Sequence, residues 1–358
     1  MARIKLDHVG HTYVEGAGEE DYALKPIDLT WQDGGTYALL GPSGCGKTTM
    51  LNIISGLVAP SEGRVWFDDR DMTHVRTARR NIAQVFQFPV TYASMTAYEN
   101  LAFPLVCRNW PRERIRSKVG EIANLLDLGG KLNKAARSLS GDEKQLISLG
   151  RGLVRDDVSA VLMDEPLTVI DPQLKFHLRR KLKEINERFG LTVIYVTHDQ
   201  NEAMTFAGQV LVMSDGRVVQ SGTPEELFEY PQTTYVGYFI GSPAMNFFDA
   251  EIGAEGPVLA GVALKCSHPP TALARGPVRI GVRPEYLELV DKPMVNALPA
   301  TVLAVQDHGR VRVVEVAVDK AKARVKLGRD KPVPSGGIWL RFPPEKIRLY
   351  VGGELLPT

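Results

Sequence analysis

The most constraining feature of this chain is the stretch from Leu39 to Thr49. An apolar run leads into a glycine-rich turn, a lysine and two threonines, which is the pattern G-x-x-x-x-G-K-[ST] of a phosphate-binding loop. Glycines allow a tight turn whose N–H groups point at one spot, and a helix starting near Gly46 adds its positive end. The stretch therefore predicts a nucleoside triphosphate site. The residues expected to bind it are Gly41, Pro42, Ser43, Gly44, Cys45, Gly46, Lys47, Thr48 and Thr49.

Composition narrows what such a site can serve. The formal net charge of the 358-residue chain is +1, which gives no electrostatic basis for binding nucleic acid. The three cysteines form no C-x-x-C pair, which fits a reducing cytoplasm. No apolar run approaches the length of a membrane-spanning helix, so we expect any role at a membrane to depend on a partner.

Hydrophobic periodicity predicts two domains. From residue 1 to 240, strands alternate with helices, which indicates an α/β nucleotide-binding domain with a mostly parallel sheet. From residue 241 to 358, proline and glycine become frequent, strands are short, and no long helical stripe remains. This second part is expected to be a separate all-β domain, with the character of a small barrel.

Polar side chains follow three of the expected strands. Asp164 and Glu165 end the apolar run from Ala160, His198 follows the run from Val193, and Gln87 follows the run from Ile82. A carboxylate at the end of a buried strand is costly unless it binds a cation, so Asp164 and Thr48 predict a Mg²⁺ site. Glu165 is the expected general base for an attacking water. A role of His198 at the γ-phosphate outweighs a purely structural one because of its place in a nucleotide-binding sheet.

The combination resembles the ATPase subunits of ABC transporters over essentially the whole chain. The resemblance implies ATP as ligand and places Gln87 in the Q-loop, where it would bridge the metal, the water and a moving segment. It also assigns Asp171 to the loop that crosses the dimer, and Ser140 and Gly141 to the start of the L-S-G-G-Q signature. In this family two domains sandwich two ATP molecules, each between one phosphate-binding loop and the other chain's signature. Tyr13 resembles the aromatic residue that stacks on adenine, with Tyr22 as the alternative.

The C-terminal part narrows the resemblance further. The stretches Phe239–Phe247 and Gly281–Glu285 look like the junction and OB-like β-domain of carbohydrate-import ATPases, of the maltose and glycerol-phosphate types. That resemblance implies a regulatory or dimer-contacting β-domain, a membrane permease and an extracytoplasmic solute-binding protein as partners, and a place at the cytoplasmic face of the plasma membrane. An inorganic anion, iron or a polyamine stays open as cargo. A soluble ABC ATPase is disfavoured, because we see no tandem ATPase domain or coiled-coil insertion.

The signature departs from the family pattern. Asp142 and Glu143 stand where the family has its second glycine and its glutamine. Ser140 and Glu143 have the spacing of a capping box, but two carboxylates at a helix start repel a facing triphosphate. The sequence therefore favours a heterodimer, in which a second ATPase chain with an intact signature completes the stronger site. A homodimer that turns Asp142 away is the alternative.

Overall fold

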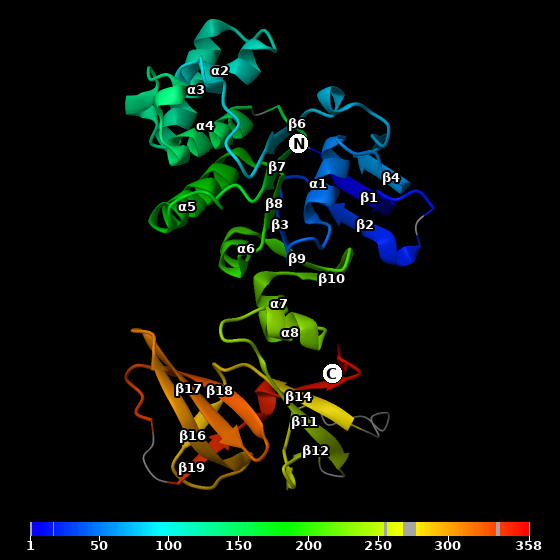
Figure 1. Cartoon of the computed structure of the whole chain (residues 1–358), viewed down its shortest axis with the longest axis vertical. Helices are drawn as coiled ribbons and strands as arrows, with labels where there is room; N and C mark the ends of the chain where they lie inside the picture. Colours follow the sequence, from blue (N-terminus) through cyan, green and yellow to red (C-terminus); the bar gives the residue numbers. More distant parts are fainter. Residues whose placement is uncertain are drawn as a thin grey trace. The chain divides into compact units, whose positions relative to one another are not determined.

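The computed structural model describes residues 2–16, 18–155, 157–253, 256–267, 277–333 and 337–357. Its contacts divide the chain into two compact units, Met1–Pro224 and Glu225–Thr358 (Figure 1). The break between the units comes earlier in the chain than the boundary expected after residue 240. Among the described residues, no helix is both long and apolar enough to cross a membrane.

The first unit is built on two sheets. The central sheet has the strand order β10-β9-β3-β8-β7-β6, and its strands are parallel except that β10 runs antiparallel to β9. An antiparallel sheet has the order β2-β1-β4-β5. The strands are β1 (Ile4–Thr12), β2 (Tyr22–Trp31), β3 (Thr36–Leu40), β4 (Glu62–Phe67), β5 (Arg70–Asp71), β6 (Ile82–Val85), β7 (Ala160–Asp164), β8 (Val193–Thr197), β9 (Gln209–Ser214) and β10 (Arg217–Gly222).

Six helices of this unit follow from the periodicity of the sequence. Helix α4 begins after Ser140, α5 has Pro172 at its first position, and Gly190 ends α5 in the left-handed conformation. Helices α2, α3 and α4 form a group beyond the β6 side of the central sheet (Figure 1). The helices are α1 (Lys47–Ser55), α2 (Ala97–Val106), α3 (Arg112–Leu125), α4 (Gly141–Leu153), α5 (Pro172–Phe189) and α6 (Gln200–Phe206).

Helix α1 is anchored between the two sheets. Its Met50, Leu51, Ile53 and Ile54 are fully buried and share one hydrophobic core with strands of both sheets. Each such side chain contributes about 1.5–3 kcal/mol by leaving water. This packing fixes the loop between β3 and α1, which is the predicted phosphate-binding loop.

The second unit is a pair of antiparallel sheets that share one apolar core, which confirms the prediction of an all-β domain. It begins with α7 (Pro224–Glu229) and α8 (Thr234–Phe239). The buried Arg283 donates hydrogen bonds to the carbonyl oxygens of Phe228, Gly237 and Ile240, so this helical segment belongs with the β-domain. Its strands are β11 (Asn246–Gly253), β12 (Gly256–Leu259), β13 (Val262–Ala263), β14 (Pro277–Val282), β15 (Glu288–Val290), β16 (Ala297–Asp307), β17 (Val311–Val318), β18 (Ala321–Gly328), β19 (Ile338–Arg341), β20 (Arg348–Val351) and β21 (Glu354–Leu355).

Candidate active site

The parallel register of the central sheet brings the predicted site residues to one edge. Leu40 at the end of β3 pairs with Thr197 at the end of β8, and Asp164 at the end of β7 pairs with Val196. The loops that follow these strands therefore leave the sheet side by side. Ligands of open α/β sheets bind at this carboxyl edge.

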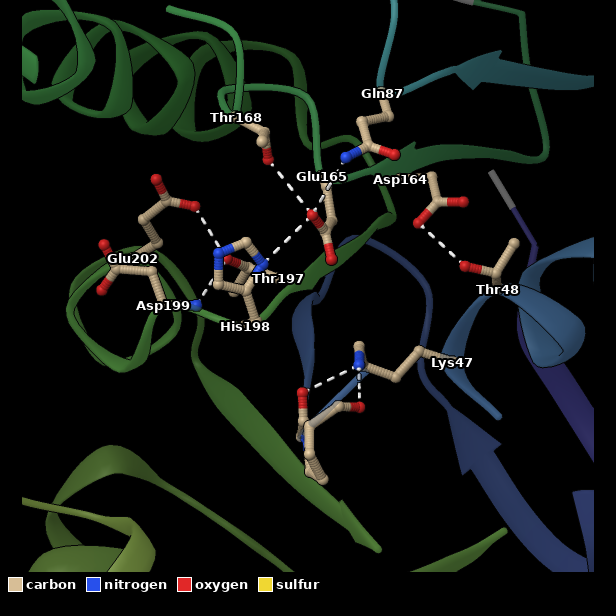
Figure 2. Close-up of polar contacts among 12 residues, drawn as sticks. Lys47, Thr48, Gln87, Asp164, Glu165, Thr168, Thr197, His198, Asp199 and Glu202 are labelled. Carbon is tan, nitrogen blue, oxygen red and sulfur yellow. Dashed lines mark hydrogen bonds and ion pairs between the residues drawn. The ribbon is translucent and has the colours of Figure 1, made fainter. Parts of the chain in front are cut away.

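The phosphate-binding loop is held in a shape that only glycine permits at two positions. Gly44 and Gly46 have φ values of 83° and 99°. A Cβ on Gly46 would lie 2.4 Å from the carbonyl oxygen of Ala23. The buried Lys47 donates hydrogen bonds from Nζ to the carbonyl oxygens of Gly41 and Pro42, at 2.8 and 2.7 Å (Figure 2). The loop thus holds its lysine in place.

Thr48 and Asp164 face each other across the start of α1. The Thr48 hydroxyl donates to Oδ1 of Asp164 at 3.3 Å (Figure 2). Burial raises the pKa of the Asp164 carboxyl, against the opposing effect of the Thr48 hydrogen bond. Burial disfavours the charged form of this carboxylate, and a bound cation would offset that cost. The carboxylate and the neighbouring hydroxyl are hard oxygen donors, which Mg²⁺ prefers.

Glu165 lies at the centre of a group of donors. Its Oε2 lies 3.1 Å from Nδ1 of His198, 3.2 Å from Oγ1 of Thr168 and 3.4 Å from Nε2 of Gln87 (Figure 2). The backbone of Glu165 has a φ of 44°, in the left-handed region. Strain of this kind persists only where the surrounding structure enforces it. The structure therefore brings Gln87, Glu165 and His198 into one cluster, as the sequence predicted.

The cavity of about 230 Å³ beside the loop is lined by residues from three segments. They are Ala23, Ser43, Gly44, Gly46, Lys47, Thr48, Thr49 and Glu165. Glu165, the predicted base, and the phosphate-binding loop thus share one cavity.

The Tyr13 hydroxyl contacts the phosphate-binding loop. This hydroxyl is 3.3 Å from Oγ1 of Thr49, Tyr13 is 64% exposed, and its ring stands edge-on to His11. The hydroxyl of Tyr22 instead forms a hydrogen bond with Glu62, which raises the pKa of Tyr22. An exposed aromatic face next to the loop is what stacking on a base requires.

The signature and the Asp171 loop do not join this cluster. Ser140 caps α4 and Asp171 caps α5, each with its side-chain oxygen. Within the described part of the chain, no hydrogen bond or ion pair links Ser140, Gly141 or Asp171 to the phosphate-binding loop. A role of Ser140, Gly141 and Asp171 at an ATP site therefore stays a prediction.

Three residues with a bearing on the site were missed in the sequence. Gln145 is fully buried and donates to the carbonyl oxygens of Phe86 and Pro166, which connects α4 to the loops of Gln87 and Glu165. Lys131 forms an ion pair with Glu143. Glu202 accepts hydrogen bonds from the strand before His198. Only the i,i+4 spacing of His198 and Glu202 was visible in the sequence, and spacing alone does not show burial.

Comparison with known proteins adds the family. A model of the ABC transporter family matches residues 24–168, and a model of the MalK OB fold domain matches residues 241–287. The trehalose import ATP-binding protein SugC of Mycobacterium tuberculosis is 39% identical over 336 residues, which are 92% of this chain and 81% of SugC. The sn-glycerol-3-phosphate import ATP-binding protein UgpC of Salmonella typhi is 35% identical over 356 residues, which are 98% of each chain.

Solved structures agree with this assignment. CbiO1 from Clostridium perfringens, part of the ABC transporter complex cbiONQ, aligns with a TM-score of 0.57 and 28% identity, over 63% of this chain and 90% of that chain. The ATP-binding cassette MJ0796, in a dimeric post-hydrolysis state bound to ADP and Pi, aligns with a TM-score of 0.55 and 33% identity, over 62% and 98%. Both matches confirm the predicted P-loop fold. The chain belongs to the ABC transporter family, as an ATPase of the import ATP-binding type.

Proposed function

We propose that this ATPase energises the import of a sugar, a polyol or a glycerol-type solute. The similarity to SugC and UgpC, which extends through both domains, supports this solute class. The observation that carries the catalytic part of the proposal is the cluster of Gln87, Glu165 and His198, whose Glu165 shares a cavity with the phosphate-binding loop. An inorganic anion, iron or a polyamine is the alternative cargo.

In the proposed reaction, Lys47 exchanges its two carbonyl partners for the β- and γ-phosphates of ATP. Thr48 and Asp164, with Gln87, would hold Mg²⁺, which supplies positive charge to the phosphates when bound. Glu165 orients the attacking water and accepts its proton as general base. His198 contacts the γ-phosphate with the ring that now lies 3.1 Å from Glu165. Tyr13 stacks on adenine.

The structure changes the expectation that a different ATPase chain is the partner. The sequence favoured a different ATPase chain because two acids crowd the start of α4. In the structure, Glu143 is turned to Lys131 and to the backbone of Ser140, so one of the two charges is neutralised within the chain. We therefore propose a second copy of this chain as partner. The relatives give no support for a heterodimer.

The proposed assembly also includes a permease and an extracytoplasmic solute-binding protein, with the ATPase at the cytoplasmic face of the plasma membrane. The exposed segment after Gln87 is the proposed permease contact. Phe88 is 66% exposed there, and Val90 and Tyr92 are also exposed. Exposed large apolar side chains next to a catalytic residue are typical of an interface.

Glu165→Gln tests the proposed base. We expect steady-state ATPase activity to fall by about a hundredfold or more, because an amide cannot accept the proton of water, while binding of ATP is retained. Glu187→Gln, an exposed acid on α5, is the matched control and should leave turnover unchanged. Turnover at the wild-type rate in Glu165→Gln would refute the assignment.

The solute is tested separately in proteoliposomes that hold the ATPase with its permease. Trehalose and sn-glycerol-3-phosphate, each presented with the solute-binding protein, are the probes. Stimulation of ATPase activity by one of them supports the proposed class. Stimulation by molybdate, iron or spermidine alone would move the chain to the alternative cargo.

A further inference from the structure

A buried carboxylate lies behind the site and has no part in the chemistry described so far. Glu202 on α6 is only 4% exposed. Its Oε2 accepts hydrogen bonds from the hydroxyls of Tyr195, at 2.9 Å, and Thr197, at 2.8 Å. Burial of a carboxylate is costly unless donors surround it, so this arrangement needs a specific reason.

The hydrogen bonds of Glu202 reach the backbone on both sides of His198. Oγ1 of Thr197, which donates to Glu202, also accepts a hydrogen bond from the backbone N–H of Asp199 at 3.0 Å (Figure 2). The residue before His198 and the residue after it are therefore tied to one carboxylate. The His198 side chain itself is 55% exposed, and its Nδ1 faces Oε2 of Glu165.

The same carboxylate also reaches a second element. Nη1 of Arg179 lies 3.9 Å from Oε1 of Glu202, and the Arg179 and Glu202 side chains are 19% and 5% exposed. Arg179 is on α5, the helix that Asp171 caps. Glu202 thus contacts the turn of His198 through Oε2, and its Oε1 lies near the Arg179 guanidinium on α5.

We propose that Glu202 is a positioning residue for ATP hydrolysis, which acts by fixing the turn Thr197–Asp199 so that the His198 ring stands beside Glu165. This inference rests on the proposed function of His198. The geometry assigns the effect to Oε2 of Glu202 as the acceptor of the Thr197 hydroxyl, because that hydrogen bond, at 2.8 Å, is the shorter contact. The Arg179 ion pair, at 3.9 Å, is secondary.

Three variants separate the acceptor from the charge. Glu202→Leu removes both, Glu202→Gln keeps an oxygen for Thr197, and Thr197→Val removes only the hydroxyl and keeps the shape of the side chain. We expect kcat to fall about tenfold or more in Glu202→Leu and Thr197→Val, with the KM for ATP within about twofold, since small displacements of a catalytic group cost this much. Glu202→Gln should stay within about threefold of wild type.

A double-mutant cycle with His198→Ala distinguishes positioning from a structural effect. If Glu202 acts through His198, Thr197→Val and Glu202→Leu lower kcat no further once His198 is absent, within about twofold. Additive losses, or an equal loss in Glu202→Gln, would overturn the inference. Full activity in His198→Ala alone would instead overturn the proposed role of His198. Thr197→Val keeps the test decisive if Glu202→Leu does not fold.

Discussion

Lys131→Met tests whether the altered signature is neutralised from within the chain. Lys131, the last residue of a 3-10 helix at Gly129–Lys131, forms an ion pair with Oε1 of Glu143. The other oxygen of Glu143 accepts a hydrogen bond from the backbone N–H of Ser140 at 2.9 Å. Without the lysine, Glu143 and Asp142 both present a full negative charge at the start of α4. In the proposed dimer, that helix end faces the γ-phosphate bound by the partner chain.

The magnitude follows from the exposure of the pair. The side chains of Lys131 and Glu143 are 40% and 20% exposed, so solvent screens the charge as at a protein surface. A repulsion between a carboxylate screened in this way and a facing phosphate is worth about 0.2–1 kcal/mol. If the repulsion acts in the transition state, the ATPase rate falls by about 1.4- to fivefold. The free energy of unfolding should change by no more than about 1 kcal/mol.

The assay is steady-state ATPase activity of the wild type, Lys131→Met, Glu143→Gln and the double variant. Glutamine at position 143 keeps the capping box with Ser140, because its carbonyl oxygen accepts the same hydrogen bond. The double variant should therefore recover to within about twofold of the wild type. Lys183→Met, an exposed lysine on α5, is the control. A double variant as slow as Lys131→Met would refute the reasoning, since the carboxylate charge would then not be the cause.

Three further predictions concern stability. Arg283→Met should lower the free energy of unfolding of the second unit by about 3–5 kcal/mol in urea, because buried carbonyl oxygens lose their donor; a loss below about 1 kcal/mol would contradict this. Gly46→Ala should cost at least about 1–2 kcal/mol and abolish ATP binding in a filter assay, because its φ is 99° and its Cβ would meet Ala23. Burial raises the pKa of Asp164, so its contribution to stability is greatest below the usual value of 3.8 and is lost as pH rises through the raised pKa. Asp164→Asn should therefore be more stable than wild type at neutral pH in urea denaturation, with no gain in acid; equal curves at neutral pH would count against it.

Sequence and structure agree most closely where local chemistry sets the backbone. The glycines of the loop from Gly41 to Thr49 predicted a tight turn, and two of them, Gly44 and Gly46, have positive φ in the structure. The capping box of Ser140 and Glu143, the first-turn Pro172 and the terminal Gly190 were all readable, and each marks a helix end. Such signals depend on neighbours within a few residues, so one sequence contains them.

Side-chain contacts between segments distant in the chain could not be predicted from the sequence. Lys131 is twelve residues before Glu143, in a glycine-containing turn with no helical or strand period, and nothing local marks it as a partner. The sequence therefore overstated the negative charge at α4. In the sequence, Gln145 is one polar residue among others on a helix. Its contacts with the loops of Gln87 and Glu165 exist only in the folded chain.

The sequence by itself determined that this chain binds a triphosphate, that its acids and histidine follow strands of one parallel sheet, and that a β-domain comes second. These conclusions follow from residue types at fixed spacing, which bonding geometry translates directly into local shape. Only the tertiary structure decided which charged side chains form ion pairs and which backbone turns are fixed by hydrogen bonds to buried side chains. Glu143 is neutralised by Lys131, and the His198 turn is held by Glu202, because long-range packing chooses the partners of a buried or half-buried charge.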